Sequence, residues 1–233
     1  MASRAARSVA GAAAVAGFAV TLTVSLAGAG TAEQIRGTPQ PDLIRGTADA
    51  DTIRGLAGRD TIRARAGADL VLGGRGADLL EGQSGNDTIE GNKSDDLIRG
   101  EHGDDVLRGH GGRDRIEGAE GNDTLYGGRA AGSDDDSMFG GSGDDVAFGR
   151  DGGDFFNLGP GADTIHARGG RDEVEDYGGR DRVRLGAGAD LIRMVDDGQH
   201  DRIDCGDGAD SVVYYGSRDA RDELDGCENV YVD

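Results

Sequence analysis

The chain of 233 residues has no tryptophan, only three prolines and few aromatic residues, which make up 4% of the sequence. Burial of a Leu- or Phe-sized side chain stabilises a fold by about 1.5–3 kcal/mol, so this composition argues against a globular core built on large side chains. Glycine is abundant instead, at 44 residues, and ordering glycine costs more backbone entropy than ordering any other residue. The chain is therefore either disordered or organised by something other than a conventional core.

Positive charge is also scarce in this chain. Lys and Arg number 25 against 45 Asp and Glu, which gives a formal net charge of -20 and an isoelectric point of about 4.4. An excess of this size repels phosphate groups, so it argues against nucleic acid and anionic lipid as partners. Cations are the partners that it favours.

Acidic residues are absent from the N-terminal segment. Two arginines precede an apolar run at residues 9–26, and small residues up to Ala32 offer cleavage sites. This order is typical of a secretory signal peptide, so we predict a signal segment at residues 1–32 that is cleaved after position 29 or 32. A retained membrane anchor is the alternative, because the run is near the lower length limit for a spanning helix. No later segment is long and apolar enough to span a bilayer, so we expect a secreted, extracellular protein without membrane contact after cleavage.

Sequence motifs of catalysis are missing as well. The chain has no H-E-x-x-H, G-x-S-x-G or P-loop motif, and its four histidines have no cysteine partner in a credible context. Carboxylates are numerous, but the repeat described next explains them. We therefore predict that the protein is not an enzyme.

What the sequence does contain is a repeat of nine residues. Asp recurs at this spacing without a slip from Asp42 to Asp123, and again from Asp136 to Asp190. Three more copies follow small insertions, which gives 20 positions that we call the register Asp. The residue two places after each register Asp is apolar, and Gly stands two places before it in 14 of the 20 copies. Such regularity at a fixed period indicates a repeat architecture.

The residues of one repeat predict a short strand followed by a sharp turn. The apolar residue and its two neighbours alternate as in a strand, with the apolar side chain inward. The glycines before the Asp supply the positive φ that the turn needs. Two repeats then form one flattened coil, and residues 18 apart pair in parallel ladders. Twenty repeats make about ten rungs, or ~48 Å of stack.

Two segments carry a resemblance to a known family. Residues 73–81 and 140–148 match the pattern G-G-x-G-x-D-x-U-x throughout. The chain thus resembles the RTX-type, or hemolysin-type, calcium-binding nonapeptide repeat proteins over about residues 37–225. The resemblance implies an all-β fold, a parallel β-roll or two-faced β-solenoid of about 20 repeats. It also implies calcium ions held between successive turns on the same edge.

The chemistry of the stacked turns agrees with calcium. Carboxylates at rung spacing repel one another unless a cation lies between them. Ca²⁺ accepts six to eight oxygen ligands in flexible geometry, whereas Mg²⁺ prefers a rigid octahedral shell and keeps its waters. Within the uninterrupted runs we count thirteen same-edge pairs of register Asp. The predicted metal-site residues are Asp60, Asp69, Asp78, Asp87, Asp96, Asp105, Asp114, Asp123, Asp145, Asp154, Asp163, Asp172, Asp181 and Asp190, with Gly73, Gly76, Gly82, Gly85, Gly100, Gly103, Gly118, Gly121, Gly140 and Gly143.

Several turns depart from the pattern. The turns before Asp42 and Asp51 lack the expected Gly, and we interpret them as an N-terminal cap. Ser94 and Asp134 replace Gly in two other turns, for which we expect weaker binding. The predicted organisation is a β-roll at 33–126, an irregular insertion at 127–139, a second β-roll run at 140–193 and a C-terminal cap at 194–233.

Outward positions of the strands show a charge pattern on one face. Taken every 18 residues, they alternate as Arg63, Glu81, Arg99 and Glu117. We expect these residues to form cross-strand ion pairs that fix the rung register. We interpret the outward faces as solvated surfaces and not as ligand-binding stripes.

Only two cysteines occur, Cys205 and Cys227. Export to an oxidising environment favours a disulfide between them. The segment around them resembles the disulfide-tied end of secreted actinobacterial-type repeat proteins. A metal-binding pair is the weaker alternative, because no His lies nearby at ligand spacing.

The predicted function is therefore a secreted calcium-binding repeat protein that folds when extracellular Ca²⁺ enters its turns. One alternative is a calcium-stiffened adhesin or cell-envelope protein with a cell-wall or polysaccharide partner. The other is an accessory module of a polysaccharide-acting enzyme.

Overall fold

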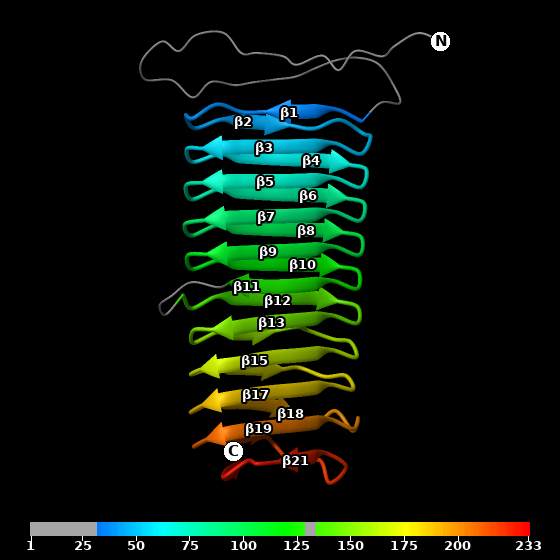
Figure 1. The fold of residues 1–233 in the computed structure, drawn as a ribbon. Coiled ribbons are helices and arrows are strands. Elements are labelled where there is room, and N and C mark those ends of the chain that lie inside the picture. The colour runs from blue at the N-terminus through cyan, green and yellow to red at the C-terminus, as the bar shows by residue number, and fades with distance from the viewer. Residues whose placement is uncertain (1–31, 129–133) are drawn as a thin grey trace, which may run out of the picture.

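The computed structural model describes residues 32–128 and 134–233, which wind into a parallel β-solenoid. Two parallel sheets of 11 strands each lie face to face, and every coil contributes one strand to each sheet (Figure 1). The predicted all-β roll is thus confirmed. The predicted signal segment lies outside the described residues, except for its last residue. Within the described parts of the chain, no helix is long and apolar enough to cross a membrane.

Strands alternate between the two sheets along the chain. The first sheet contains β1 (Gln34–Arg36), β3 (Thr52–Ala57), β5 (Leu70–Arg75), β7 (Thr88–Lys93), β9 (Val106–Gly111), β11 (Thr124–Gly128), β13 (Val146–Asp151), β15 (Thr164–Gly170), β17 (Arg182–Gly188), β19 (Arg202–Gly208) and β21 (Glu223–Asp225). The second contains β2 (Leu43–Arg45), β4 (Thr61–Ala66), β6 (Leu79–Ser84), β8 (Leu97–His102), β10 (Arg115–Glu120), β12 (Ser137–Ser142), β14 (Phe155–Asn157), β16 (Glu173–Asp176), β18 (Leu191–Val195), β20 (Ser211–Tyr215) and β22 (Asn229–Val232).

The ladders pair residues 18 apart, as the repeat predicts. Ile62 faces Leu80 in the second sheet, for example. The pairing also continues across the insertion, where Ile116 faces Met138 at a separation of 22. The strands beyond the insertion therefore return to the same register.

The stack contains two more strands than the 20 register Asp indicate. β1 and β22 place Ile35 and Val230 in line with the buried column, and the register position before them holds Glu33 and Glu228. Glu228 accepts a hydrogen bond from the N–H of Asp210 at 2.9 Å, as a register Asp would. Counting Asp alone missed these copies, although the aliphatic spacing was present.

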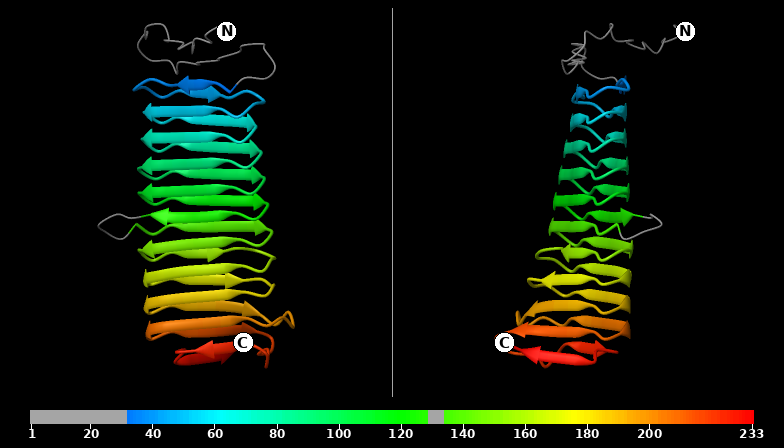
Figure 2. Two further views of the ribbon diagram at one scale, coloured as in Figure 1. Left: turned by 45° about the vertical axis from the view of Figure 1, so that its right-hand side comes forward. Right: turned by 90° about the vertical axis from the view of Figure 1, so that its left-hand side faces the viewer.

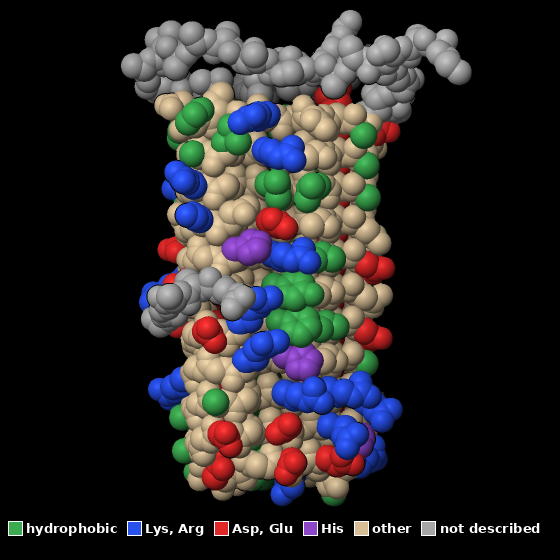
Figure 3. Space-filling view, viewed as in Figure 1, with side chains coloured by type: hydrophobic (Ala, Val, Ile, Leu, Met, Phe, Trp, Pro, Cys, Tyr) green, Lys and Arg blue, Asp and Glu red, His purple; other side chains and the backbone are tan. Residues whose placement is uncertain are grey.

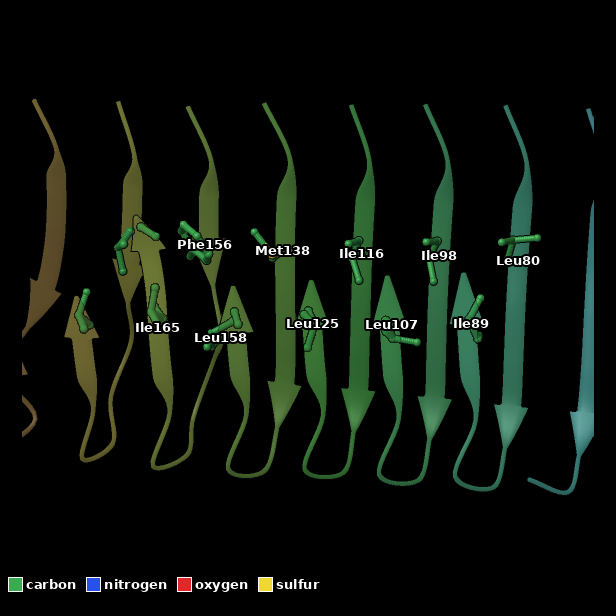
Figure 4. Packing of buried hydrophobic residues seen from close by; sticks show 14 of the residues in the cluster. Leu80, Ile89, Ile98, Leu107, Ile116, Leu125, Met138, Phe156, Leu158 and Ile165 are labelled. Atoms are coloured by element: carbon green, nitrogen blue, oxygen red, sulfur yellow. The ribbon is translucent and has the colours of Figure 1, made fainter. Parts of the chain in front are cut away.

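The core is a single narrow layer between the sheets. One apolar side chain per strand points inward, and Ile62, Leu80 and Ile89 are completely buried (Figure 4). A second inward position, two residues later, is mostly Gly in the N-terminal half and includes Leu158, Tyr214 and other larger residues in the C-terminal half. The two sheets accordingly lie farther apart toward the C-terminal end (Figure 2).

Two segment boundaries differ from those expected. The irregular insertion is shorter than 127–139, because β11 continues to Gly128 and β12 begins at Ser137. The segment 194–233, expected as a cap, continues both sheets with β19 to β22. Its apolar residues at Ile203 and Val212 keep the spacing that the buried column requires.

The ion pairs expected on the second sheet are present. Arg63 lies 2.6 Å from Glu81, and Arg99 lies 2.8 Å from Glu117 and 3.7 Å from Glu81. Together with Arg115, which contacts Glu117 at 2.5 Å, these side chains neutralise one another along this face. The network favours the observed register over a slipped one.

A disulfide joins Cys205 and Cys227 across the last coils, as expected from the sequence. Cys205 is fully buried in the second inward column.

We expect the Cys205→Ala, Cys227→Ala double variant to lose about 3 kcal/mol of unfolding free energy, because the bond closes a loop over a separation of 22 residues. Thermal unfolding in saturating calcium measures the loss. A reducing agent should lower the melting temperature of the parent chain and leave that of the variant unchanged. A parent chain that is insensitive to reduction would contradict the prediction.

Candidate metal-binding turns

The register Asp form two columns, one along each edge of the flattened roll. All of the Asp predicted as metal-site residues are buried, with side chains at most 5% exposed. Successive members of a column belong to adjacent rungs, so the structure brings together the same-edge pairs that the repeat predicts. The columns also run across the insertions, joining Asp114 to Asp136 and Asp181 to Asp201.

One carboxylate oxygen of each register Asp has a fixed partner. Oδ1 of Asp78 accepts a hydrogen bond from the backbone N–H of Asp60 at 2.8 Å, and Oδ1 of Asp105 accepts one from Asp87 at 2.7 Å. The same bond recurs along both columns, always from one rung to the next toward the C-terminus. This hydrogen bond holds each carboxylate inside its turn and thereby also fixes the orientation of the other oxygen, Oδ2.

The other carboxylate oxygen has no partner. Oδ2 is buried without a hydrogen bond in fourteen register Asp, although an unpaired buried acceptor costs about 1–3 kcal/mol and more when charged. A chain that repeats this loss fourteen times requires something else at that position. The residues are Asp60, Asp69, Asp78, Asp87, Asp96, Asp105, Asp114, Asp123, Asp136, Asp145, Asp154, Asp172, Asp190 and Asp210.

The buried carboxylates also hold protons more tightly than carboxylates in water. Burial raises the pKa of Asp78 to about 6 and that of Asp87 to about 7, and the charge of the Asp one rung below adds to the increase. The N–H bond to Oδ1 lowers these values only in part. Burial thus makes the bare charge in these turns costly, and a bound proton or a bound cation relieves that cost.

Glycines five residues before the register Asp make room for the carboxylate. A Cβ added to Gly82 would lie 2.3 Å from Oδ2 of Asp87, and one added to Gly100 would lie 2.1 Å from Oδ2 of Asp105. A Cβ added to Gly73, Gly118 or Gly140 would also lie too close to Oδ2 of the register Asp five residues later. These predicted site glycines are required because a side chain would fill the space that the carboxylate occupies.

Glycines two residues before the register Asp stack on one another. Gly103 has φ +124°, and a Cβ there would lie 2.2 Å from the carbonyl oxygen of Gly85. Gly76, Gly85, Gly121 and Gly143 show the same conformation and the same contact with the rung before. No N–H of the described chain donates to the carbonyl oxygens of Gly76, Gly85 or Gly103. These oxygens are therefore free acceptors that line the turn.

The donor set of a turn suits a hard cation. It consists of unpaired carboxylate oxygens and free glycine carbonyls, with no sulfur or imidazole among them. Calcium accepts such oxygen sets at varied angles, whereas magnesium requires a stricter octahedron. The register Asp and the turn glycines would hold the ion, and the ion would supply the positive charge that the columns lack.

The first two turns differ from the others. In the turn before Asp51, Thr47 donates to Oδ2 of Asp51 twice, from its N–H at 2.7 Å and from its hydroxyl at 3.0 Å. Thr38 donates to Oδ2 of Asp42 in the same way, from its N–H at 2.6 Å and from its hydroxyl at 3.1 Å. Donors point at the oxygen that is unpaired elsewhere, so these turns are closed without a cation. The N-terminal cap interpretation therefore has a specific structural basis.

We expect Thr47→Val to lower the unfolding free energy in calcium by about 1–2 kcal/mol, because the part-buried hydrogen bonds of its hydroxyl with Oδ2 of Asp51 and with the N–H of Asp49 are lost. The number of bound calcium ions should not change, since this turn has no place for one. Thermal unfolding and titration calorimetry measure the two quantities. Thr61→Val, on the outside of β4, is the control and should have little effect. Loss of a bound ion in the Thr47 variant would argue against a closed turn.

The turns expected to bind weakly contain the same unpaired oxygen. Ser94 adopts φ +81°, a conformation that Gly adopts at lower cost, and Oδ2 of Asp96 is still unpaired. Oδ2 of Asp136, in the turn that contains Asp134, is unpaired too. Their relative affinity stays a prediction.

One cluster was missed by the sequence analysis. Asp176 occupies the position that is Gly in most turns, and its carboxylate lies within 4.8 Å of those of Asp181 and Asp201. Burial, followed by the charge of Asp181, raises the pKa of Asp176 to about 8. Acidic residues are so numerous in this chain that composition does not single out Asp176. The signal that could have identified it was its register position, five residues before Asp181.

The fold and the turns together define a class of protein. It is a parallel β-roll whose edges consist of glycine-rich turns around buried carboxylates that are suited to bind cations. The chain belongs to the family of RTX calcium-binding nonapeptide repeats, which matches it at residues 28–62, 45–80, 81–116, 103–131, 130–165 and 158–192. No curated protein gives a significant match. The repeats of this family typically bind Ca²⁺ as a structural ligand, and the turns described above fit that ion.

Proposed function

We propose that this chain is a secreted protein that folds into its β-roll when extracellular calcium enters the turns. The observation that carries the proposal is the carboxylate oxygen that is buried and unpaired in fourteen register Asp. Without a counterion, stacking these groups costs desolvation and like-charge repulsion, and one apolar side chain per strand is a weak counterweight. The cation therefore supplies free energy for folding itself.

Secretion is supported by two features of the chain. The disulfide at the C-terminal end is a bond of oxidising compartments. The apolar N-terminal segment has the order of a signal peptide. Extracellular calcium is also concentrated enough to fill sites of about 10⁻⁴–10⁻³ M affinity, the range of extracellular modules.

We further propose that calcium has a structural and not a catalytic role. The register carboxylates are buried within the turns, so a substrate would not reach an ion held there. Each carboxylate also takes part in a pair above and a pair below, which predicts cooperative uptake.

The geometry gives an expected number of ions. The structure contains eight same-edge pairs on one edge and four on the other in which both Oδ2 atoms are unpaired. About a dozen strong sites thus replace the thirteen counted in the sequence. Pairing across the insertions adds three pairs, whereas the two closed N-terminal turns remove two and Asp163, whose Oδ2 is not unpaired, removes two more.

Circular dichroism and titration calorimetry of the mature chain test the proposal together. We expect a disordered spectrum in EGTA, a β spectrum in millimolar CaCl₂, and cooperative binding of about a dozen ions. Magnesium at the same concentration should not restore the fold. An identical spectrum with and without calcium would refute coupled folding, and binding without a spectral change would leave calcium as a ligand of a preformed roll.

A further inference from the structure

The outer face of the first sheet has a charge opposite to that of the protein as a whole. Over β9, β11, β13, β15 and β17, the only acidic residue is Asp151, the last residue of β13. The same strands carry five arginines, which are Arg108, Arg150, Arg168, Arg182 and Arg184. We call these arginines, together with the aromatic rings between them, the basic strip. Figure 3 shows basic, hydrophobic and histidine side chains in succession down the middle of this face, with acidic side chains at its margins and at both ends of the succession.

In the ladder, acidic residues face these arginines only at the two ends of the basic strip, where Glu90 lies opposite Arg108 and Asp204 lies opposite Arg184. None of the five arginines forms an ion pair with a described carboxylate, whereas Arg63 and Arg99 on the second sheet are paired at 2.6 and 2.8 Å. Arg150 and Arg168 are direct cross-strand neighbours, an arrangement of like charges that costs stability. Arg168, Arg182 and Arg184 are exposed. The outer face of the second sheet is thus neutralised by its own ion pairs, whereas the basic strip on the first sheet presents guanidinium groups that form no ion pair.

Three rings form the middle of the basic strip. Tyr126 stacks on Phe148 at 5.0 Å between ring centroids, and Phe148 stacks on His166 at 5.1 Å. Arg108 lies over the free face of Tyr126 at 4.9 Å. Burial and the charges of Arg184 and Arg168 lower the pKa of His166, which indicates a positive local field. The ladder ties five rungs into one flat surface of about 19 Å.

The geometry limits what this surface binds. Both faces of Phe148 are occupied by stacking on Tyr126 and His166, and Arg108 covers the other face of Tyr126, so few ring faces remain for the bases of a single-stranded nucleic acid. Acidic turn residues such as Asp104 and Asp144 flank the basic strip, and they would repel a wide polyanion such as a duplex or a bilayer surface. A narrow chain with regularly spaced acidic groups fits between these margins, with guanidinium groups as bidentate donors.

We propose that the basic strip binds a linear acidic polysaccharide that lies along the roll axis. The binding is independent of the calcium sites, which lie at the edges of the roll and not on its face. Calcium contributes only by maintaining the fold that aligns the five strands.

The test uses the full mature chain in saturating calcium, with a hyaluronan oligosaccharide as the probe. Neutral dextran and oligo-dT of similar length are the comparison ligands. Arg182→Glu, Arg184→Glu is the test variant, and Arg36→Glu, Arg45→Glu is a control with the same net charge outside the basic strip. Circular dichroism verifies that both variants fold.

We expect hyaluronan to bind more tightly than either comparison ligand, with affinity falling as salt rises. The test variant should lose at least about tenfold in affinity, because contacts to charged groups are removed, and the control should change less than twofold. Binding of hyaluronan no tighter than dextran would overturn the proposal. Equal loss in both variants would also overturn it, and so would oligo-dT binding as tightly as hyaluronan.

Discussion

In the absence of calcium, acidification from about pH 8 to about pH 5 is expected to fold the roll. Burial raises the pKa of Asp105 and Asp154 to about 7 in the folded chain, against 3.8 for an unperturbed Asp. The folded chain therefore binds more protons than the unfolded chain between these values. Stability from this source is fully present below the unfolded pKa of 3.8 and is lost as the pH rises through about 7.

The choice of about pH 5 separates the two kinds of carboxylate. Register Asp with a pKa of about 7, such as Asp105 and Asp154, are protonated there in the folded state, while the pKa of Glu117 is lowered by Arg99 and Arg115, so that their ion pairs persist. Circular dichroism in EGTA across this range measures the transition. In calcium the dependence reverses, since protons compete with the ion and the apparent affinity should fall below about pH 7. A calcium-free chain that is equally disordered at both pH values would contradict the prediction.

A matched pair of variants tests the same cause at a single turn. Asp105→Asn removes one buried charge and keeps an oxygen that can accept the hydrogen bond from Asp87. This variant should fold more readily than the parent in EGTA and bind calcium more weakly. Asp104→Asn, one residue earlier and exposed, should do neither. A general change in stability would shift folding in the same direction with and without calcium. Opposite effects of Asp105→Asn in the two conditions would therefore point to the buried charge.

The second large effect is expected from Gly103→Ala. The new Cβ would lie 2.2 Å from the carbonyl oxygen of Gly85, in a backbone conformation of φ +124° that side chains rarely adopt. The obstructing atom belongs to the backbone, and the N–H of Gly85 is held by a hydrogen bond to the carbonyl oxygen of His102 at 2.9 Å, so the turn cannot easily shift away. We expect a loss of at least about 2 kcal/mol and a large increase in the calcium concentration at the folding midpoint.

Gly111→Ala is the matched control for this substitution. The nearest atom to a Cβ at Gly111 is 3.7 Å away, and the residue lies in the same part of the stack. This variant should be neutral or slightly stabilising, because it reduces the entropy of the unfolded chain. Calcium titrations followed by circular dichroism compare the two. Equal shifts in both variants would show that loss of any glycine, and not the close approach of the rungs, sets the midpoint.

The repeat made most of the fold predictable. Its spacing fixed which residue of each strand points inward and which Asp lie on the same edge, because an 18-residue coil allows no other alignment. Gap lengths of 22 and 20 residues are less informative, since they do not show whether the extra residues loop out or break the stack. The joining of Asp114 to Asp136 therefore emerged only from the structure.

Exceptions within the repeat were harder to predict. Thr47 closes its turn through both its N–H and its hydroxyl, and this depends on a backbone conformation that composition does not reveal. The basic strip was not predicted from the sequence for a different reason. Counting every 18 residues stops at the insertion, so the sequence does not show that Phe148 and His166 continue the outward column of Tyr126.

The stacked columns make the folded chain a linear polyelectrolyte. With two edges and a rung spacing of ~4.8 Å, the roll carries one register carboxylate per ~2.4 Å of its axis. Duplex DNA carries one charge per ~1.7 Å and condenses counterions around itself for that reason. A folded roll with ionised columns would need counterions at a comparable density, and calcium supplies two charges per ion. Calcium affinity should therefore decrease as the sodium concentration rises, because sodium screens the same columns.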